Sequence, residues 1–162
     1  MITKRSVRLQ TLSMLDLQMH TVFWDIGSCT GSVSIEAKSL YPELEVIAFE
    51  RRPEGAELLR ANSVKWGTPG IRFVGGDFME QPLTDLPRPD AVFIGGHGGR
   101  LQELLKRADE VLLPGGVIVF NSVSENSLQQ FYEGVAQTGR RVTERIRLVV
   151  DAHNPIEILK AE

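Results

Sequence analysis

Short apolar segments and amphipathic stretches alternate along this chain, and the alternation stops near residue 142. Short apolar runs predict buried strands and amphipathic stretches predict helices, so their alternation is typical of α/β proteins. The last two β-like segments, 142–150 and 156–159, are separated by only five residues. A helical crossover needs about a dozen residues, so these two strands must be antiparallel. The predicted elements before them are the strands Val22–Ile26, Glu45–Phe49, Ile71–Val74, Ala91–Ile94 and Val117–Phe120, and the helices Thr3–Leu17, Ser32–Leu40, Pro53–Lys65, Leu101–Leu112 and Ser124–Gly139.

Five parallel strands followed by an antiparallel hairpin are the pattern of class I methyltransferases. We therefore expect an α/β, Rossmann-like fold with a mostly parallel sheet of seven strands in the order 3-2-1-4-5-7-6 and helices on both faces. With 162 residues, of which 42% are hydrophobic and 24% charged, the chain is long enough for one domain with a full core.

The segment 25–31 follows the first predicted strand and opens a helix. Its glycines let the backbone approach a ligand closely, and the helix start presents free N–H groups. Cys29 occupies the middle of the turn, so the spacing departs from the G-x-G-x-x-G pattern of dinucleotide sites. Asp25 would repel a pyrophosphate but suits an ammonium group, such as that of S-adenosylmethionine; a glycine-rich turn without a ligand is the alternative. The predicted cofactor contacts here are Asp25, Gly27, Ser28, Thr30 and Gly31.

Acidic residues also end the second and third predicted strands. Glu50 can accept hydrogen bonds from both ribose hydroxyls, and Asp77 can accept one from the adenine amino group. Phe78 is expected either to stack on the adenine ring or to pack in the core. Because the carboxyl ends of parallel strands border one crevice, these acids are expected to converge with Asp25 on a single ligand. We assign Thr3, Arg51, Gly76 and Gly95 to the same cofactor site.

Three stretches, Ile2–Arg8, Trp24–Ala37 and Phe93–Gly99, carry a narrower likeness. The third is the most specific, because ordinary class I methyltransferases seldom have so many glycines after the fourth strand. Nearly the whole chain resembles the decarboxylating domain of the precorrin-6Y C5,15-methyltransferase family of cobalamin biosynthesis. The chain departs from the family pattern at Cys29, where a glycine is common, at His97, where serine is frequent, and in the short link between the last two strands.

The resemblance implies methylation of a reduced tetrapyrrole at a meso carbon, C-15, with S-adenosylmethionine as methyl donor, and decarboxylation of the acetate on ring C. It also implies a homo-oligomer, a tetramer. The family domain occurs alone or fused behind a second tetrapyrrole methyltransferase domain. We therefore expect residues 1–162 to form one methyltransferase domain, either a separate subunit or the C-terminal half of a bifunctional protein.

The glycine run 95–99 is expected to admit a large flat substrate, with its N–H groups holding carboxylates or the ring. We predict His97 as a general acid or a carboxylate partner, with Gly96 and Arg100 beside it in the catalytic site. The acetate and propionate groups of such a substrate need a local basic cluster. The candidates are Lys4, Arg5, Arg8 and Arg100, and a solvated helix face is the alternative for each.

Composition narrows the function classes further. The net charge of −3 and pI near 5.7 do not favour nonspecific nucleic-acid binding, and no apolar run is long enough to span a membrane. The single cysteine fits a reducing cytoplasm and cannot form a multi-thiolate metal site, so no metal is expected. The alternatives are a methyltransferase acting on RNA or protein and a non-catalytic cofactor-binding scaffold; a dehydrogenase is disfavoured by the glycine spacing and the terminal hairpin.

Overall fold

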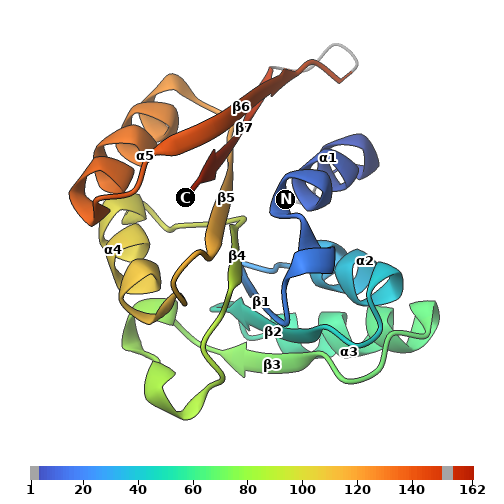
Figure 1. The fold of residues 1–162 in the computed structure, drawn as a ribbon. Coiled ribbons are helices and arrows are strands. Elements are labelled where there is room, and N and C mark those ends of the chain that lie inside the picture. The colour runs from blue at the N-terminus through green and yellow to red at the C-terminus, as the bar shows by residue number, and fades with distance from the viewer. Residues whose placement is uncertain (1–3, 151–154) are drawn as a thin grey trace.

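A mixed sheet of seven strands runs through the middle of the molecule in the order β3-β2-β1-β4-β5-β7-β6 (Figure 1). The computed structural model describes residues 4–150 and 155–162. The first five strands are parallel, and β7 is antiparallel to both of its neighbours, which confirms the predicted fold class and strand order. The strands are β1 (Val22–Ile26), β2 (Glu45–Glu50), β3 (Arg72–Gly75), β4 (Ala91–Ile94), β5 (Val117–Ser122), β6 (Val142–Leu148) and β7 (Ile156–Ala161).

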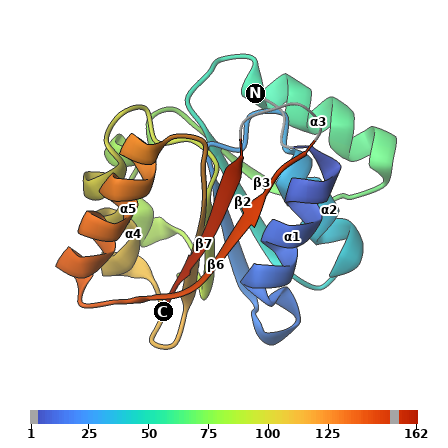
Figure 2. The same cartoon turned by 90° about the horizontal axis from the view of Figure 1, so that it is seen from above.

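Helices cover both faces of this sheet. Figure 2 shows α1, α2 and α3 on one side of the strands and α4 and α5 on the other. The helices are α1 (Arg5–Leu15), α2 (Ser32–Leu40), α3 (Gly55–Trp66), α4 (Leu101–Val111) and α5 (Glu125–Thr138). Short 3-10 turns follow α1 at Leu17–Met19 and lie between β3 and β4 at Phe78–Glu80 and Leu83–Asp85.

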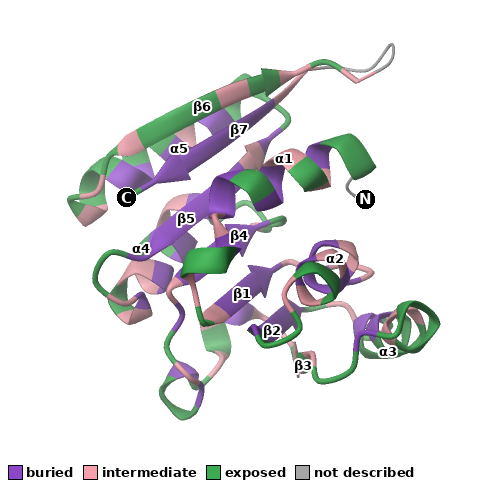
Figure 3. Ribbon diagram, turned by 45° about the vertical axis from the view of Figure 1, so that its right-hand side comes forward, coloured by how far each residue is buried: buried purple, intermediate pink, exposed green. Residues whose placement is uncertain are grey.

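The central strands are buried on both faces (Figure 3). Successive side chains of a strand point to opposite faces, so β1 supplies two cores. Trp24 and Ile26 pack in the cluster that includes the inner faces of α4 and α5. Phe23 packs in the cluster that contains residues of α1 and α2. Because both faces of these strands are buried, successive residues are apolar, and the parallel strands therefore form continuous apolar runs in the sequence.

The first helix is shorter than predicted. It begins at Arg5 with Lys4 as its N-cap residue, two residues after the predicted start; Thr3 itself lies outside the described residues. The helix ends at Leu15 rather than Leu17, because Asp16 adopts a left-handed conformation with φ of 54°. A left-handed residue cannot continue a right-handed helix.

The third helix begins two residues later than predicted, at Gly55 rather than Pro53. The Glu50 carboxylate accepts a hydrogen bond from the Arg52 N–H at 2.9 Å, and the Gly55 N–H donates to the Arg52 carbonyl at 3.0 Å. These bonds hold residues 51–54 in a turn around Glu50. Pro53 therefore lies in that turn and not in the first turn of the helix.

The C-terminal half follows the sequence prediction closely. The Ser124 hydroxyl caps α5 by accepting from the Ser127 N–H at 3.1 Å, and Gly139 ends the helix with φ of 77°. The hairpin strands β6 and β7 are antiparallel as predicted, although β6 ends at Leu148 rather than residue 150. Most of their short link, residues 151–154, lies outside the described residues. Within the described ranges, no helix is long and apolar enough to cross a bilayer.

Candidate active site

A cleft of about 290 Å³ lies at the carboxyl ends of the first four strands. This is the edge where open α/β sheets bind ligands. Most of the residues predicted for the cofactor and catalytic sites border it. The predicted residues that line the cleft are Gly27, Glu50, Arg51, Gly76, Asp77, Phe78, Gly95, Gly96, His97 and Arg100.

Two glycine turns meet at one end of the cleft. The N–H groups of Gly95 and Gly96 both donate to the Ile26 carbonyl, at 2.8 and 3.3 Å. Gly27 has φ of 76°, and a Cβ on it would lie 2.6 Å from the backbone nitrogen of Gly96. The turn after β1 and the turn after β4 are therefore in backbone contact, which only glycine at position 27 permits.

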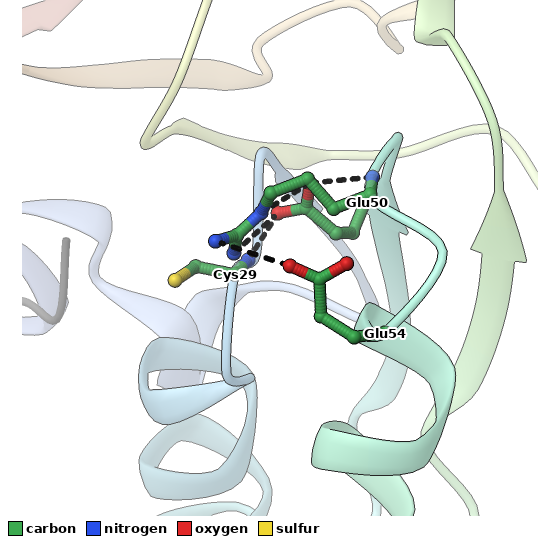
Figure 4. Close-up of polar contacts among 4 residues, drawn as sticks. Cys29, Glu50 and Glu54 are labelled. Carbon is green, nitrogen blue, oxygen red and sulfur yellow. Dashed lines mark hydrogen bonds and ion pairs between the residues drawn. The ribbon is translucent and has the colours of Figure 1, made fainter.

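Among the carboxylates that line the cleft, Glu50 accepts the most hydrogen bonds, and both of its oxygens have partners (Figure 4). The backbone N–H groups of Cys29 and Arg52 donate to it at 2.7 and 2.9 Å. The Arg52 guanidinium adds two longer bonds, 3.2 Å from Nε and 3.4 Å from Nη2. Burial raises the pKa of the Glu50 carboxyl, but these hydrogen bonds outweigh it and hold the pKa below its usual value.

The four bonds occupy the acceptor capacity of Glu50, two at each oxygen. The two backbone bonds orient the carboxylate, whereas the longer guanidinium bonds come from a side chain that is 40% exposed. A ligand with two hydroxyls can therefore reach Glu50 only by replacing the Arg52 guanidinium. Sequence reasoning placed the carboxylate but missed this resident partner.

Asp25 does not line the cleft. It is 1% exposed, and its Oδ2 accepts from the Ser34 N–H at 3.1 Å and the Ser34 hydroxyl at 2.6 Å. Its Oδ1 is buried and has no hydrogen-bond partner among the described residues. Burial raises the pKa of Asp25 to about 6; the Ser34 hydrogen bonds oppose that shift, and the Glu50 charge adds to it. The carboxylate therefore faces α2, and its predicted contact with an ammonium group stays a prediction.

The raised pKa of Asp25 makes a testable contribution to stability. The folded-state pKa of about 6 exceeds the ordinary value of 3.8, so the folded protein binds the proton more tightly than the unfolded chain does. The free energy of unfolding should therefore fall as pH rises from about 4 to 6, by roughly 3 kcal/mol, and stay lowered above that range. We expect Asp25→Asn to lack this slope while keeping an acceptor for Ser34. Urea unfolding of both proteins across pH 4–7 measures it, and parallel curves would contradict the expectation.

Asp77 and Arg100 bind each other across the mouth of the cleft through Asp77 Oδ2 and Arg100 Nη2. Asp77 Oδ1 accepts from the Met79 N–H at 2.9 Å and so caps the short 3-10 turn. Phe78 is 5% exposed and packs edge-on against Phe49 with ring centroids 5.0 Å apart. Phe78 is thus mainly a core residue with one edge at the cleft. Each Asp77 oxygen has one partner here, so it can still accept a second hydrogen bond, and the Arg100 guanidinium keeps further donors beside the one that it gives to Asp77.

His97 lies in the glycine run with its ring against Phe120, at a centroid distance of 6.0 Å. Its Nδ1 accepts a hydrogen bond from the Gly99 N–H at 3.2 Å. Burial lowers the pKa of His97, which favours the neutral ring. With Nδ1 as an acceptor, the neutral ring carries its proton on Nε2. This arrangement suits a hydrogen-bond donor better than a general acid.

The remaining predicted residues lie away from the cleft. Ser28 is buried, and its hydroxyl has no partner among the described residues. A Cβ on Gly31 would lie 2.0 Å from Leu59, so this glycine serves the packing of α3. Thr30 borders a second hollow of about 550 Å³, which is lined by α1, α2 and α3. Arg5 and Arg8 also line that hollow, and Arg8 pairs with Glu36 at 2.5 Å, so the predicted basic cluster is divided between two places.

Several cleft residues were missed by sequence reasoning. Phe49, Met79 and Leu104 line the cleft, and none of them bears a functional group that would single it out. Phe49 and Met79 adjoin Glu50 and Phe78 in the sequence, and that adjacency was the available signal. Leu104 lies in the first turn of α4, after Arg100.

This sheet order, with a glycine turn after β1 and a carboxylate at the end of β2 on one cleft, defines a class I S-adenosylmethionine-dependent methyltransferase fold. The chain belongs to the family described as the precorrin methyltransferase domain, whose model matches residues 1–160. The expected resemblance is thereby confirmed, and the chain is a methyltransferase by family.

Individual relatives agree with the family match. The chain is 35% identical over 155 residues to the cobalt-precorrin-6B C(15)-methyltransferase (decarboxylating) of Salmonella typhimurium, covering 96% of this chain and 79% of the relative. It is 41% identical over 123 residues to the precorrin-6Y C(5,15)-methyltransferase [decarboxylating] of a Sinorhizobium species, covering 76% of this chain but only 29% of that longer protein. The crystal structure of precorrin-6y C5,15-methyltransferase from Geobacter metallireducens superposes with a TM-score of 0.90 at 39% identity, covering 99% and 89% of the two chains.

Proposed function

We propose that this chain methylates a precorrin tetrapyrrole at C-15, using S-adenosylmethionine, and removes the carboxyl group of the ring C acetate. The observation that carries the proposal is the match over residues 1–160 to the precorrin methyltransferase family, together with close relatives named for both activities. We also propose that the cleft at the carboxyl ends of β1–β4 is the cofactor site.

The residues at the cleft fit such a cofactor. The contact between the turns of Gly27 and Gly96 keeps side chains out of one end, so an extended ligand can approach the backbone. Glu50 remains ionised because its pKa is held low, and two of its four bonds come from an exchangeable guanidinium. A ribose diol would replace that guanidinium and restore the acceptor pairing of the carboxylate. When bound, S-adenosylmethionine supplies a methyl group on a positively charged sulfur.

In this reaction the protein has to position the two substrates and need not supply a nucleophile. A reduced tetrapyrrole provides its own electron-rich carbon, which must be held about 3–3.5 Å from the methyl group. In the decarboxylation the bond to the carboxyl carbon breaks and carbon dioxide leaves. The electron pair enters the conjugated ring, and the side-chain carbon takes a proton, so that a methyl group remains. The glycine run with His97 borders the cleft and lies where it can hold the macrocycle.

The direct test is to incubate the protein with S-adenosylmethionine and cobalt-precorrin-6B, or its metal-free counterpart, and to record mass spectra of the pigment. We expect the gain of one methyl group and the loss of one carboxyl group, both dependent on the protein. Calorimetric binding of S-adenosylmethionine is measured in parallel. Cofactor binding with an unchanged pigment in both metal states would contradict the proposed substrate, and methylated RNA or protein in place of pigment would support the alternative.

A further inference from the structure

Three arginines border the cleft, and they differ in their partners. Arg52 pairs with Glu50 and lies 3.9 Å from a carboxylate oxygen of Glu54. Arg100 pairs with Asp77. Arg51, by contrast, has no ion pair or hydrogen bond from its side chain to any residue within 4–150 and 155–162. The cleft therefore presents one guanidinium whose charge the described part of the chain does not neutralise.

The Arg51 guanidinium lies against the loop after β4 rather than beside a carboxylate. Its backbone directly follows Glu50 at the end of β2, and its guanidinium reaches across to the glycine run after β4. A Cβ built on Gly98 would lie 3.0 Å from Nη1 of Arg51 and 3.6 Å from Cζ. The absence of a side chain at position 98 is thus what lets the guanidinium rest on that loop.

Further hydrogen-bond donors belong to the loop against which this guanidinium lies. The backbone N–H groups of His97 and Gly98 have no acceptor among the described residues. The neutral His97 ring, with its proton on Nε2, lies in the same loop. A guanidinium beside unpaired amides is a site for an anion of carboxylate type.

We propose that Arg51, resting on the loop at Gly98, binds a carboxylate of the tetrapyrrole that the reaction retains, and thereby orients the macrocycle in the cleft. This inference rests on the proposed function and assigns the substrate side of the same site. It moves Arg51 from the cofactor site, where the sequence analysis placed it, to a contact with the tetrapyrrole.

Charge explains why the partner is a retained carboxylate. Adenosine carries no anionic group, so an unpaired guanidinium gains little from it. A guanidinium paired with the departing carboxylate would stabilise the ground state more than the transition state, because the negative charge moves into the ring as carbon dioxide leaves. Such a pair would slow the reaction. A side-chain carboxylate that persists has no such conflict.

Steady-state kinetics of Arg51→Gln with cobalt-precorrin-6B test the assignment. We expect KM for the pigment to rise at least about tenfold, because a charge-assisted pair is lost. We expect kcat, the dissociation constant for S-adenosylmethionine and the ratio of decarboxylated to methylated product to stay within about twofold of wild type. Arg51→Lys keeps the charge but not the planar, two-pronged donor group, so its KM for the pigment should lie between those of the wild type and Arg51→Gln.

Two loop glycines offer a matched pair of variants. Gly98 and Gly99 both have left-handed backbones, with φ of 57° and 86°, so alanine at either position adds similar strain. A Cβ at position 98 meets the Arg51 guanidinium, whereas a Cβ at position 99 meets nothing within 4 Å. We therefore expect Gly98→Ala to raise KM more than Gly99→Ala at a similar kcat. In the Arg51→Gln background, the difference in KM between the two glycine variants should vanish.

The outcomes separate this inference from the proposed function. An active wild-type protein with an unchanged KM in Arg51→Gln would overturn the role of Arg51 alone. Weakened S-adenosylmethionine binding would place Arg51 at the cofactor, for example at its methionine carboxylate, and would overturn it too. A changed ratio of decarboxylated to methylated product would show that Arg51 holds the departing carboxylate, and it would overturn the inference as well. No turnover by the wild type would overturn the proposed function and this inference with it.

Discussion

Gly27→Ala is expected to lower the free energy of unfolding by roughly 3–5 kcal/mol. The new Cβ would lie within 2.9 Å of the nitrogen, Cα and carbonyl oxygen of Gly96, and all three are backbone atoms that cannot rotate away. The φ of 76° adds about 1–2 kcal/mol of strain for any residue with a side chain. Chemical denaturation at neutral pH measures the loss, and a folded variant should also bind S-adenosylmethionine more weakly.

Gly115→Ala is the matched control for that prediction. Gly115 has φ of 77°, nearly the same as Gly27, but a Cβ on it would meet nothing within 4 Å. It should therefore show the backbone strain alone, about 1–2 kcal/mol, with unchanged cofactor binding. Equal losses for the two variants would show that the contact between the turns of β1 and β4 contributes nothing to stability.

Glu50→Gln is expected to weaken S-adenosylmethionine binding about 100-fold, or ~3 kcal/mol. The amide removes the charge that strengthens bonds to the ribose hydroxyls. It also turns a donor toward the N–H of Cys29 or of Arg52, each of which needs an acceptor at this position. Isothermal titration calorimetry measures the loss. Because the pKa of Glu50 is lowered, the carboxylate stays charged between pH 8 and 6. Loss of this charge therefore does not change the affinity of the wild type for the cofactor over that range.

Arg52→Gln removes the other partner of this ion pair, and we do not expect it to weaken cofactor binding. The ribose must displace the guanidinium, so its removal is expected to leave affinity unchanged or to raise it by a few-fold. The two backbone donors to Glu50 persist in this variant, and they keep the carboxylate oriented. A tenfold loss of affinity in Arg52→Gln would mean that the guanidinium supports the bound cofactor instead of competing with it.

The sequence was sufficient to predict the architecture, and it brought most of the candidate site residues to one edge of the sheet. Alternating apolar and amphipathic segments determine the parallel strands, and the short link after residue 150 determines the antiparallel hairpin. Because parallel strands end at one edge, Glu50 and Asp77 could be brought together without any knowledge of packing. Helix ends were predictable where a local residue sets them, as Ser124 and Gly139 do for α5.

The details that the sequence did not show depend on side-chain direction and on long-range pairs. Asp25 lies near the carboxyl end of β1, as predicted. Side chains alternate between the two faces of the strand, and at this position the carboxylate points toward Ser34 and away from the cleft. The pairing of Arg100 with Asp77 joins residues 23 positions apart in the sequence. The Arg52 guanidinium at Glu50 reflects a local turn whose geometry the pattern of residue types does not encode.

The position of β7 has a consequence for how the molecule forms. This strand is the last in the sequence, yet it lies inside the sheet between β5 and β6, which do not pair with each other. Until β7 pairs, β5 is therefore an open edge of the sheet and β6 has no partner strand. Open edges invite pairing with other chains, and charged side chains discourage it. In β6, Glu144, Arg145 and Arg147 are charges of the kind that discourage such pairing, and in the finished sheet they pair with Lys160 and Glu157 of β7.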